Sequence, residues 1–365
     1  MRPDTSRALP VVLAAAAFYA AFTLTALALH GWNPLWFVWI GERWANLVPG
    51  ARSGYDGQFM YYFARDGWAA LPHLDNPSYR LQRILYPALA WVLSAGDADA
   101  LPWAMVATNA AAILVTTFLI TRWLLSHGLS RWYGLVYPLF VGTLMSYSRD
   151  LTEPLACTFA LGGTLCWLGE RRAASVCLLA LAALARETAI LFAVGLALAE
   201  LVRGRWARIA LLAATALPLL AWQVYLRSVI GTVPLAVATH LLHLPGLSTF
   251  SNLSLEPGRV SGLILLALPT LALAPLVVLW VVRTPRDSIA WLVAVQYALV
   301  LMMPVGAQLH VLVVGRQSAA LLIALLLAFP RCPPWLRAAV TACAIVPTVL
   351  WLPPVLWWAP WTATV

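Results

Sequence analysis

The chain has 365 residues, of which 62% are hydrophobic and 10% are charged, and its mean hydropathy is +0.82. A soluble core cannot hide this much apolar surface, and apolar runs of about 20 residues, enough to cross a hydrocarbon layer of about 30 Å, recur along the sequence. The composition excludes a soluble protein and predicts an all-α, polytopic helical membrane protein. We expect a single transmembrane domain over residues 1–365 and no soluble domain.

The net charge of +9 comes from 23 basic residues, every one of them an arginine. The arginines stand singly or in short groups between apolar runs, which is typical of orientation signals and phosphate-binding sites. The continuous basic face that binds nucleic acid is not present. We therefore expect membrane lipids as partners and no nucleic acid. The absence of lysine beside abundant alanine is typical of a GC-rich bacterial genome, which predicts a bacterial inner membrane protein.

Several chemistries leave no signature in the sequence. The five cysteines lie in apolar segments without the spacing of metal ligands, so we expect them to be small buried hydrophobic residues. His240, His243 and His310 also lack ligand spacing, which argues against a dedicated zinc site. The sequence has no phosphate-binding glycine loop, which argues against a soluble nucleotide donor. We expect no cofactor, and a divalent metal is not indicated.

The first quarter of the chain predicts one span followed by a long loop. Residues 9–30 form an uncleaved first span, with the N-terminus in the cytoplasm. Residues 31–82 then form the first extracytoplasmic loop. Within this loop, residues 57–68 predict a short interfacial helix because aromatic side chains cover most of its surface. Segment 83–96 is too short to span comfortably and predicts a partial or re-entrant helix.

Further apolar segments bring the prediction to about 10–12 spans or half-spans. They lie near residues 100–123, 132–148, 151–169, 173–185, 187–202, 207–227, 259–282, 288–311, 316–330 and 335–352. The segments 173–185 and 187–202 are short and meet at Arg186-Glu187, a pattern typical of helices that end at an internal polar site. Residues 228–258 form a second outer loop, which is either an ordered cap or a mobile lid.

Under this topology, polar groups from distant parts of the chain reach the same, extracytoplasmic side. They are Asp56 with Gln58; Tyr79, Arg80, Gln82, Arg83 and Tyr86; Arg149, Asp150 and Glu153; Arg186 with Glu187; and Arg316. In apolar surroundings a carboxyl group gains proton affinity, and a nearby arginine restores its charged form. A protein prepares a general base beside an anion site in this way. The positive-inside bias supports the orientation only by a small majority of the arginines.

Asp56 lies at the centre of the first loop. Glycines at 54 and 57 allow a tight turn and the close approach of a ligand, and Tyr55 and Gln58 add hydrogen-bond donors. We therefore predict that Asp56 is a catalytic general base. The alternative is that Asp56 only caps the helix that begins near Gly57.

The donor phosphate site is assigned to arginines. Arg80 and Arg83 are three residues apart, so on a helix their side chains point the same way. Two planar guanidinium groups on one face suit a phosphate or pyrophosphate. We assign Arg186 and Arg316 to the same site. The alternative is that these arginines extend to lipid headgroups at the membrane surface.

The remaining candidates are polar or aromatic neighbours of these arginines, and we predict that they contact substrate. They are Tyr55, Gln58, Tyr62, Tyr79, Gln82, Tyr86, Arg149, Asp150, Glu153 and Glu187. Arg149 and Glu153 are one helical turn apart on a continuous helix. A purely structural ion network among Arg149, Asp150 and Glu153 is therefore an equally open interpretation. The Arg186-Glu187 pair has the same two interpretations.

Short motifs along most of the chain resemble those of one known family. They are Tyr55-Asp56-Gly57-Gln58 early in the first outer loop, Ile84-Leu85-Tyr86-Pro87 after it, Tyr147 to Glu153, Ala185-Arg186-Glu187-Thr188, and Gly315-Arg316. Together they resemble the GT-C superfamily of integral-membrane glycosyltransferases, in particular the bacterial relatives of the GPI mannosyltransferases. Enzymes of this family use polyprenyl-phosphate-linked sugars as donors.

The resemblance implies a reaction as well as a fold. It implies transfer of a hexosyl or pentosyl group, with inversion, to an extracytoplasmic acceptor that is a glycan, a lipid or a protein. Asp56 then deprotonates the acceptor hydroxyl, and the arginines hold the lipid phosphate. This is chemically sensible because a phosphate leaving group needs charge stabilisation more than it needs an acid. A single acid stands at position 56 where some members have an acid-x-acid pair, which leaves metal dependence open.

Two other functions are compatible with the same features. A transporter or flippase for a lipid-linked sugar or another anionic lipid would also use arginines and half-length helices. A weak two-fold internal repeat would favour transport, and none is visible in the sequence. A structural subunit of an envelope-polysaccharide complex is the third alternative, but that role leaves the outer acids unexplained.

Overall fold

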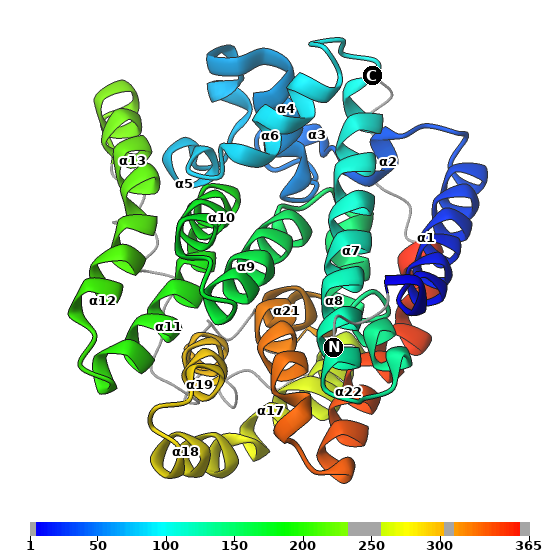
Figure 1. Cartoon of the computed structure of the whole chain (residues 1–365). Coiled ribbons are helices and arrows are strands. Elements are labelled where there is room, and N and C mark those ends of the chain that lie inside the picture. The colour runs from blue at the N-terminus through cyan, green and yellow to red at the C-terminus, as the bar shows by residue number, and fades with distance from the viewer. Residues whose placement is uncertain (1–4, 233–256, 303–309, 358–365) are drawn as a thin grey trace.

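The computed structural model describes residues 5–232, 257–302 and 310–357. All regular secondary structure in these ranges is helical (Figure 1), which confirms the expected all-α class. Within the same ranges, six helical stretches are long and apolar enough to cross a membrane. They are α1 (Leu9–Leu29), α7 (Leu101–Ser126), α12 with α13 (Trp206–Ile230), α16 to α18 (Pro257–Arg283), α21 with the turn after it (Val311–Arg331) and α22 (Pro334–Trp357). The chain is a multi-pass membrane protein.

Shorter helices lie between these spans. Those of the first loop are α2 (Leu35–Val38), α3 (Glu42–Ala45), α4 (Gly57–Asp66) and α5 (Pro77–Leu81), and the partial helix after it is α6 (Leu85–Leu93). Those of the bundle are α8 (Val141–Ser148), α9 (Glu153–Leu168), α10 (Arg172–Ala185), α11 (Ile190–Val202) and α19 (Ser288–Leu301). The predicted half-length pair is confirmed as α10 and α11, which a single turn at Glu187–Ala189 separates.

The predicted span 132–148 is wrong. Arg131–Val136 forms a 3₁₀ turn, and only Val141–Ser148 forms a helix, α8. Pro138 between them has no backbone N–H to donate. Gly134 packs tightly against α7, where an added Cβ would lie 2.0 Å from Thr121 Oγ1. As a result α8 is a half-length helix that ends inside the protein, just before Arg149.

Two other expectations need revision. Arg316 does not begin its span, because α21 starts five residues earlier at Val311, where His310 Nδ1 accepts a hydrogen bond from the Leu312 N–H. The segment 288–311 is not one continuous helix, because α19 ends at Leu301; residues 303–309 lie outside the described part of the chain. Most of the second outer loop, including His240 and His243, also lies outside it.

Helix α4 has surroundings that the sequence did not predict. The helix forms where expected, but its aromatic residues do not cover an exposed surface: Phe59, Met60, Tyr61 and Tyr62 are buried against the rest of the protein. It packs against α6 and against the turn Gly67–His73. The first loop is therefore part of the folded protein and covers one end of the bundle, which we call the loop end.

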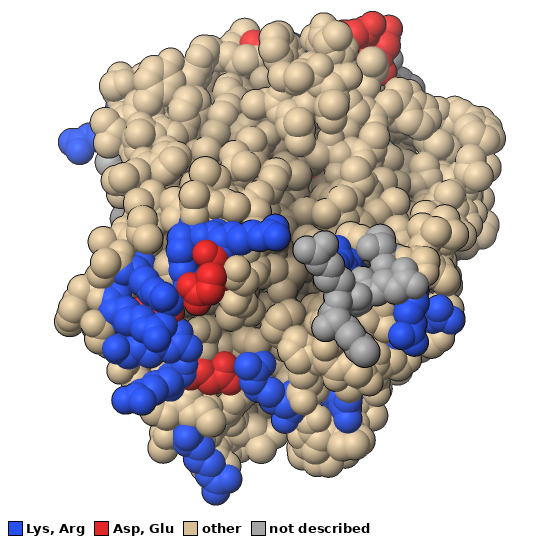
Figure 2. All heavy atoms as spheres, viewed as in Figure 1, with Lys and Arg blue, Asp and Glu red and all other residues tan. Residues whose placement is uncertain are grey.

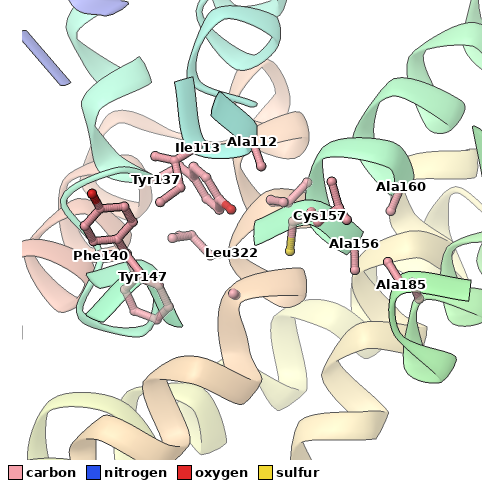
Figure 3. Packing of buried hydrophobic residues seen from close by; sticks show 14 of the residues in the cluster. Ala112, Ile113, Tyr137, Phe140, Tyr147, Ala156, Cys157, Ala160, Ala185 and Leu322 are labelled. Carbon is pink, nitrogen blue, oxygen red and sulfur yellow. The ribbon is translucent and has the colours of Figure 1, made fainter. Parts of the chain in front are cut away.

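Small residues allow the central helices to approach closely. Ala156 and Ala160 of α9 lie close to Ala185 of α10 in Figure 3. One turn farther on, an added Cβ at Gly163 would lie 2.7 Å from Leu179 Cγ. Close helix approach through small residues is typical of membrane bundles, in which lipid tails provide no hydrophobic drive for association.

The second close crossing joins α8 to α21. An added Cβ at Gly142 would lie 2.0 Å from the Gly315 carbonyl oxygen and 2.6 Å from the Arg316 nitrogen. The backbone of α8 therefore touches the residue that precedes Arg316. This contact sets the position of Arg316 from a different part of the chain.

The opposite end of the bundle carries exposed charge. Figure 2 shows arginines gathered over the lower left of one face, with acidic residues among them, while the upper part of that face has few charges. The α9–α10 turn and the α11–α12 turn reach this opposite end with the arginines Arg171, Arg172, Arg203, Arg205 and Arg208. We call it the arginine end.

Candidate functional site

The loop that carries Asp56 is held by backbone contacts at glycine. An added Cβ at Gly41 would lie 2.1 Å from the Gly54 nitrogen, so the two segments of this loop are in contact. The Gln58 side chain joins them further: its Oε1 accepts from the Gly41 N–H at 3.0 Å, and its Nε2 donates to the Ser53 carbonyl at 2.6 Å. Gln58 is completely buried and holds the two segments of the loop together; its contact with substrate stays a prediction.

Asp56 does not cap α4. It precedes the helix, but its backbone is already helical (φ −59°, ψ −28°) and its side chain makes no capping hydrogen bond. The alternative interpretation of Asp56 as a helix cap is therefore wrong. The carboxylate instead turns to two arginines: Arg316 Nη1 donates to Oδ2 at 2.9 Å, and Arg80 Nη2 lies 3.1 Å from Oδ1.

These contacts are part of a longer chain of alternating charges. Arg80 is gripped by Asp75 through two hydrogen bonds of 2.8 and 2.7 Å. On the other side, Arg316 Nε lies 3.0 Å from Glu153 Oε1, and the same oxygen lies 2.7 Å from Arg186 Nη1. We call this set the Asp56 network; its members in order are Asp75, Arg80, Asp56, Arg316, Glu153 and Arg186.

Arg83 lies close to the Asp56 network but has its own acid. Its Nε and Nη2 donate to the two Glu187 carboxylate oxygens at 2.9 and 2.8 Å, and Nη2 also donates to the Tyr79 hydroxyl at 2.7 Å. Helix α5 ends at Leu81, before Arg83. The expectation that Arg80 and Arg83 project from one helical face is therefore wrong, because the helix is too short to include both.

The electrostatics of Asp56 follow from its arginines. Burial alone raises the pKa of this carboxyl, but the guanidinium groups of Arg316, Arg80 and Arg83 outweigh burial and hold the pKa well below its usual range. The Asp56 side chain is 26% exposed, against 11% for Arg80 and 10% for Arg316. The site thus presents a charged carboxylate, reachable from outside, over two nearly buried guanidinium groups.

Tyr55 belongs to the same site. Its hydroxyl lies 3.3 Å from Arg316 Nη1 and accepts a hydrogen bond from it. The Tyr55 N–H donates to the Trp39 carbonyl at 3.0 Å, which fixes the backbone next to Asp56. Gly57 on the other side lies against α8, because an added Cβ there would be 2.1 Å from the Arg149 carbonyl oxygen. The backbone on both sides of Asp56 is therefore held in place by these contacts.

Arg149, Asp150 and Glu153 do not form the local network that remained open from the sequence. The chain leaves the helix between α8 and α9, so Arg149 and Glu153 are not one helical turn apart. Glu153 pairs with Arg186 and Arg316 instead. Asp150 has a left-handed backbone (φ 46°), and its Oδ1 lies 3.4 Å from the Tyr86 hydroxyl that donates to it.

Arg149 is fully buried under aromatic rings. Its guanidinium carbon lies 3.6 Å from the centre of the Trp39 ring and 5.0 Å from that of Trp36. Its Nη1 donates to the Ser148 carbonyl at 2.6 Å, while Nε and Nη2 have no hydrogen-bond partner in the described part of the chain. Stacking on tryptophan partly replaces the missing partners. Arg149 thus packs against the Asp56 loop, through the Trp39 ring and through its own carbonyl oxygen beside Gly57.

Two predicted substrate contacts lie apart from these charges. Tyr62 is buried in α4 beside His73, with ring centres 5.1 Å apart. Gln82 is also buried, and its Oε1 accepts from Gln223 Nε2 of α13 at 3.3 Å. The structure therefore places Tyr62 within the loop core and Gln82 at the contact between the loop and α13.

Sequence reasoning missed Asp75. It binds Arg80 with both carboxylate oxygens, and the two residues are only five positions apart in the sequence. The signal was available: Asp75 and Asn76 come directly before Pro77, the first residue of α5, and Asn76 caps that helix by accepting from the Tyr79 N–H. A carboxylate just before a short helix that carries an arginine is well placed to reach that arginine.

The acidic side chains of the site pair with arginines and do not form a group that could bind a metal ion in the described part of the chain. Across the described residues, no group of three or more histidine, cysteine or acidic side chains is close enough to hold a metal ion. The contacts that Asp56, Asp75, Glu153 and Glu187 make with charged groups are with guanidinium groups. Whether a divalent metal takes part in the reaction stays a prediction from the sequence.

A scan against protein-family models and searches of curated proteins and of solved structures find no match to this chain. The resemblance to GT-C glycosyltransferases therefore depends on the short motifs of the sequence alone.

Proposed function

We propose that the protein is a membrane glycosyltransferase that moves a sugar from a polyprenyl-phosphate-linked donor to an extracytoplasmic acceptor, with inversion. One observation carries the proposal. The Asp56 carboxylate lies between the guanidinium group of Arg80, in the first loop, and that of Arg316 in α21, which is 260 residues away from Asp56 in sequence. A carboxylate and arginines held together in a nearly buried site supply both a base and an anion site.

The arginines suit the leaving group. When the bond from the sugar C1 to the phosphate oxygen breaks, its electron pair goes to the lipid phosphate. Planar guanidinium groups already in position stabilise that charge without reorganising. Arg80 and Arg316 contact Asp56 directly. Arg83 and Arg186 are farther along, paired with Glu187 and Glu153. No acid is needed to protonate a phosphate that leaves as an anion.

Asp56 suits the acceptor. As the acceptor oxygen forms its bond to C1, its proton passes to the Asp56 carboxylate, which balances the step. The 26% exposure of this side chain is large enough for a hydroxyl group to reach it. Tyr55, whose hydroxyl lies beside Arg316 Nη1, is positioned to contact either substrate.

The proposed location is a bacterial inner membrane with the site on the extracytoplasmic side. The sign and position of the charges support this orientation. Exposed arginines gather at the arginine end, as the positive-inside bias requires of cytoplasmic loops. The Asp56 network lies at the loop end, where α9 begins and α10 and α11 meet.

Transport of a lipid-linked sugar is a second candidate, favoured by the half-length helices α10 and α11. Their junction at Arg186-Glu187 resembles the broken helices of transporters. In this chain, however, Arg186 pairs with Glu153 of α9 and Glu187 with Arg83 of the first loop. These pairs tie the junction to neighbouring elements. Sugar transfer by the purified protein in detergent, where no second compartment exists, separates an enzyme from a transporter.

The test of the enzyme begins with lipids from cells that lack the protein. A polyprenyl-phosphate-linked sugar should accumulate there, and its identity supplies the donor. Complementation then compares wild type with Asp56→Asn and, as a matched control, Arg43→Ala, since Arg43 is exposed and stacks on Trp44 at 4.9 Å. Asn keeps the size of Asp but takes no proton, so turnover should fall by about 10²–10⁴. Arg43→Ala should behave as wild type.

Two results would contradict this assignment. If Asp56→Asn turns over normally, the base is another acid, with Glu187, Asp150 and Glu153 as the remaining candidates. If no lipid-linked sugar accumulates and the purified protein transfers none, the protein is not this enzyme.

A further inference from the structure

Each arginine of the Asp56 network already has an acidic partner. Arg80 pairs with Asp75 and Asp56, Arg316 with Asp56 and Glu153, and Arg186 with Glu153. Arg83 is held separately by both oxygens of Glu187. Arg149 has unpaired nitrogens but is completely buried under Trp39. The three acids of the network balance its three arginines, so a phosphate that binds these guanidinium groups competes with a carboxylate for them.

The contacts show which carboxylate is held least firmly. Asp75 holds Arg80 with two aligned hydrogen bonds of 2.8 and 2.7 Å, whereas Asp56 touches the same guanidinium through a single contact of 3.1 Å. A two-pronged charge-assisted pair is stronger than a single contact. On Arg316 the two acids differ in exposure: Glu153 lies 3.0 Å from Nε and is only 6% exposed, while Asp56 accepts a hydrogen bond from Nη1 at 2.9 Å and is 26% exposed. Asp56 is therefore the acid of Arg316 with more room to turn towards water.

We propose that the donor phosphate binds by exchange: it replaces Asp56 on Arg80 and Arg316, and Asp75 holds Arg80 in place while this happens. The inference rests on the proposed function and specifies how its site works. Asp75 is a positioning residue, since it acts through Arg80. Asp75 binds Nε and Nη2 of Arg80, and Asp56 contacts the same Nη2, so a phosphate that replaces Asp56 would meet Arg80 at this nitrogen.

The exchange couples the two halves of the reaction. While two guanidinium groups hold Asp56, its carboxylate is a poor proton acceptor. A bound phosphate neutralises those groups and releases the carboxylate beside the leaving group. The base therefore becomes competent only in the presence of donor. Because donor binding must come before the release of Asp56, the carboxylate does not take up a proton in an empty site. The exchange therefore predicts that donor binds before acceptor.

The test measures binding of a polyprenyl monophosphate, the proposed leaving group, to the purified full-length protein in detergent. Removing either acid removes one negative charge near the phosphate, so simple electrostatics predicts tighter binding in both variants. The exchange instead predicts that the two variants change the affinity for polyprenyl phosphate in opposite directions. Asp56→Asn should bind about tenfold tighter, because the competing charge is gone. Asp75→Asn should bind several-fold weaker, because Arg80 loses its anchor, and Asp75→Glu should recover part of the loss.

Each outcome has a clear meaning. If Asp56→Asn binds no tighter than wild type, or if Asp75→Asn tightens binding as much as Asp56→Asn does, exchange is wrong while the proposed enzyme stands. If neither wild type nor any variant binds the polyprenyl phosphate, the proposed donor is wrong as well. Arg43→Ala serves as the control that should not change affinity.

A measurement on the wild type covers the case in which a variant does not fold. A hydrophobic carbodiimide reacts with protonated carboxyl groups, so it should modify Asp56 faster when polyprenyl phosphate is bound and the arginines have left it. Peptide mass spectrometry gives the rate at Asp56. An unchanged or slower rate overturns the exchange.

Discussion

Two ion clusters at opposite ends of the bundle both pair acidic residues with arginines. They differ in how far apart in the sequence the paired residues lie. At the arginine end, Glu200 lies 2.6 Å from Arg203, 3.6 Å from Arg205 and 3.8 Å from Arg208. All these partners fall within eight residues of the acid. At the loop end, Asp56 is bound by Arg316, which is 260 residues away in sequence. The first cluster is local; the second exists only in the folded protein.

The arginines of the two clusters differ in exposure, although Glu200, the acid at the arginine end, is itself only 1% exposed. The side chains of Arg203, Arg205 and Arg208 are 24%, 49% and 31% exposed. Those of Arg80, Arg186 and Arg316 are only 11%, 13% and 10% exposed. Arginines that reach water make weak contributions and serve as orientation signals. Guanidinium groups removed from water inside a membrane protein are costly to keep, which makes the loop end the stronger candidate for a functional site.

The comparison first predicts that the two ends face opposite sides of the membrane. Ser53 lies at the loop end and Ser126 at the far end of α7, and both are exposed. In a variant without native cysteines, Ser53→Cys should react with an impermeant thiol reagent in intact cells, and Ser126→Cys should react only after the membrane is opened. The measurement is a mass shift on the labelled protein. Labelling of Ser126→Cys alone in intact cells would reverse the orientation and place the proposed site in the cytoplasm.

The second prediction compares one acid from each cluster. Glu153→Gln leaves Arg316 and Arg186 without their shared partner, 10% and 13% exposed, so the free energy of unfolding should fall by about 3–5 kcal/mol. Glu200→Gln leaves arginines that can turn to water and should cost about 1 kcal/mol or less. Thermal unfolding in detergent measures both. Equal losses would show that the two clusters do not differ in the way that their exposure indicates.

The third prediction concerns the crossing that positions Arg316. Gly142→Ala places a methyl group 2.0 Å from the Gly315 carbonyl oxygen, and since both partners are backbone, the helices must separate. Stability should fall by about 1–3 kcal/mol, and polyprenyl phosphate binding should weaken because Arg316 moves.

The matched control is Gly162→Ala in α9, where the added Cβ would meet only Leu178 Cδ1 at 3.5 Å. This variant should be neutral or gain up to about 1 kcal/mol, because alanine favours a helix over glycine. If Gly142→Ala is tolerated as well as Gly162→Ala, the α8–α21 contact does not set the position of Arg316.

The sequence by itself determined the membrane class and the helices, because apolar runs of spanning length are a local property. It also drew attention to Asp56, Arg80, Arg83 and Arg316, because a charge among apolar neighbours is visible without any structure. The short helix α8 shows the limit of such patterns. The apolar composition of residues 132–148 resembles a span, while the break depends on Pro138 and on how Gly134 packs against Thr121.

Only the tertiary structure decided which acid each arginine binds. Arg149 and Glu153 looked like partners, but the chain leaves the helix between them, and Glu153 reaches Arg186 and Arg316 on other elements. The hydrogen bonds by which Gln58 joins Gly41 to Ser53 also appear only in the folded protein. Ion pairing depends on distances between elements that meet through packing, and those distances are not written in the spacing of residues along the chain.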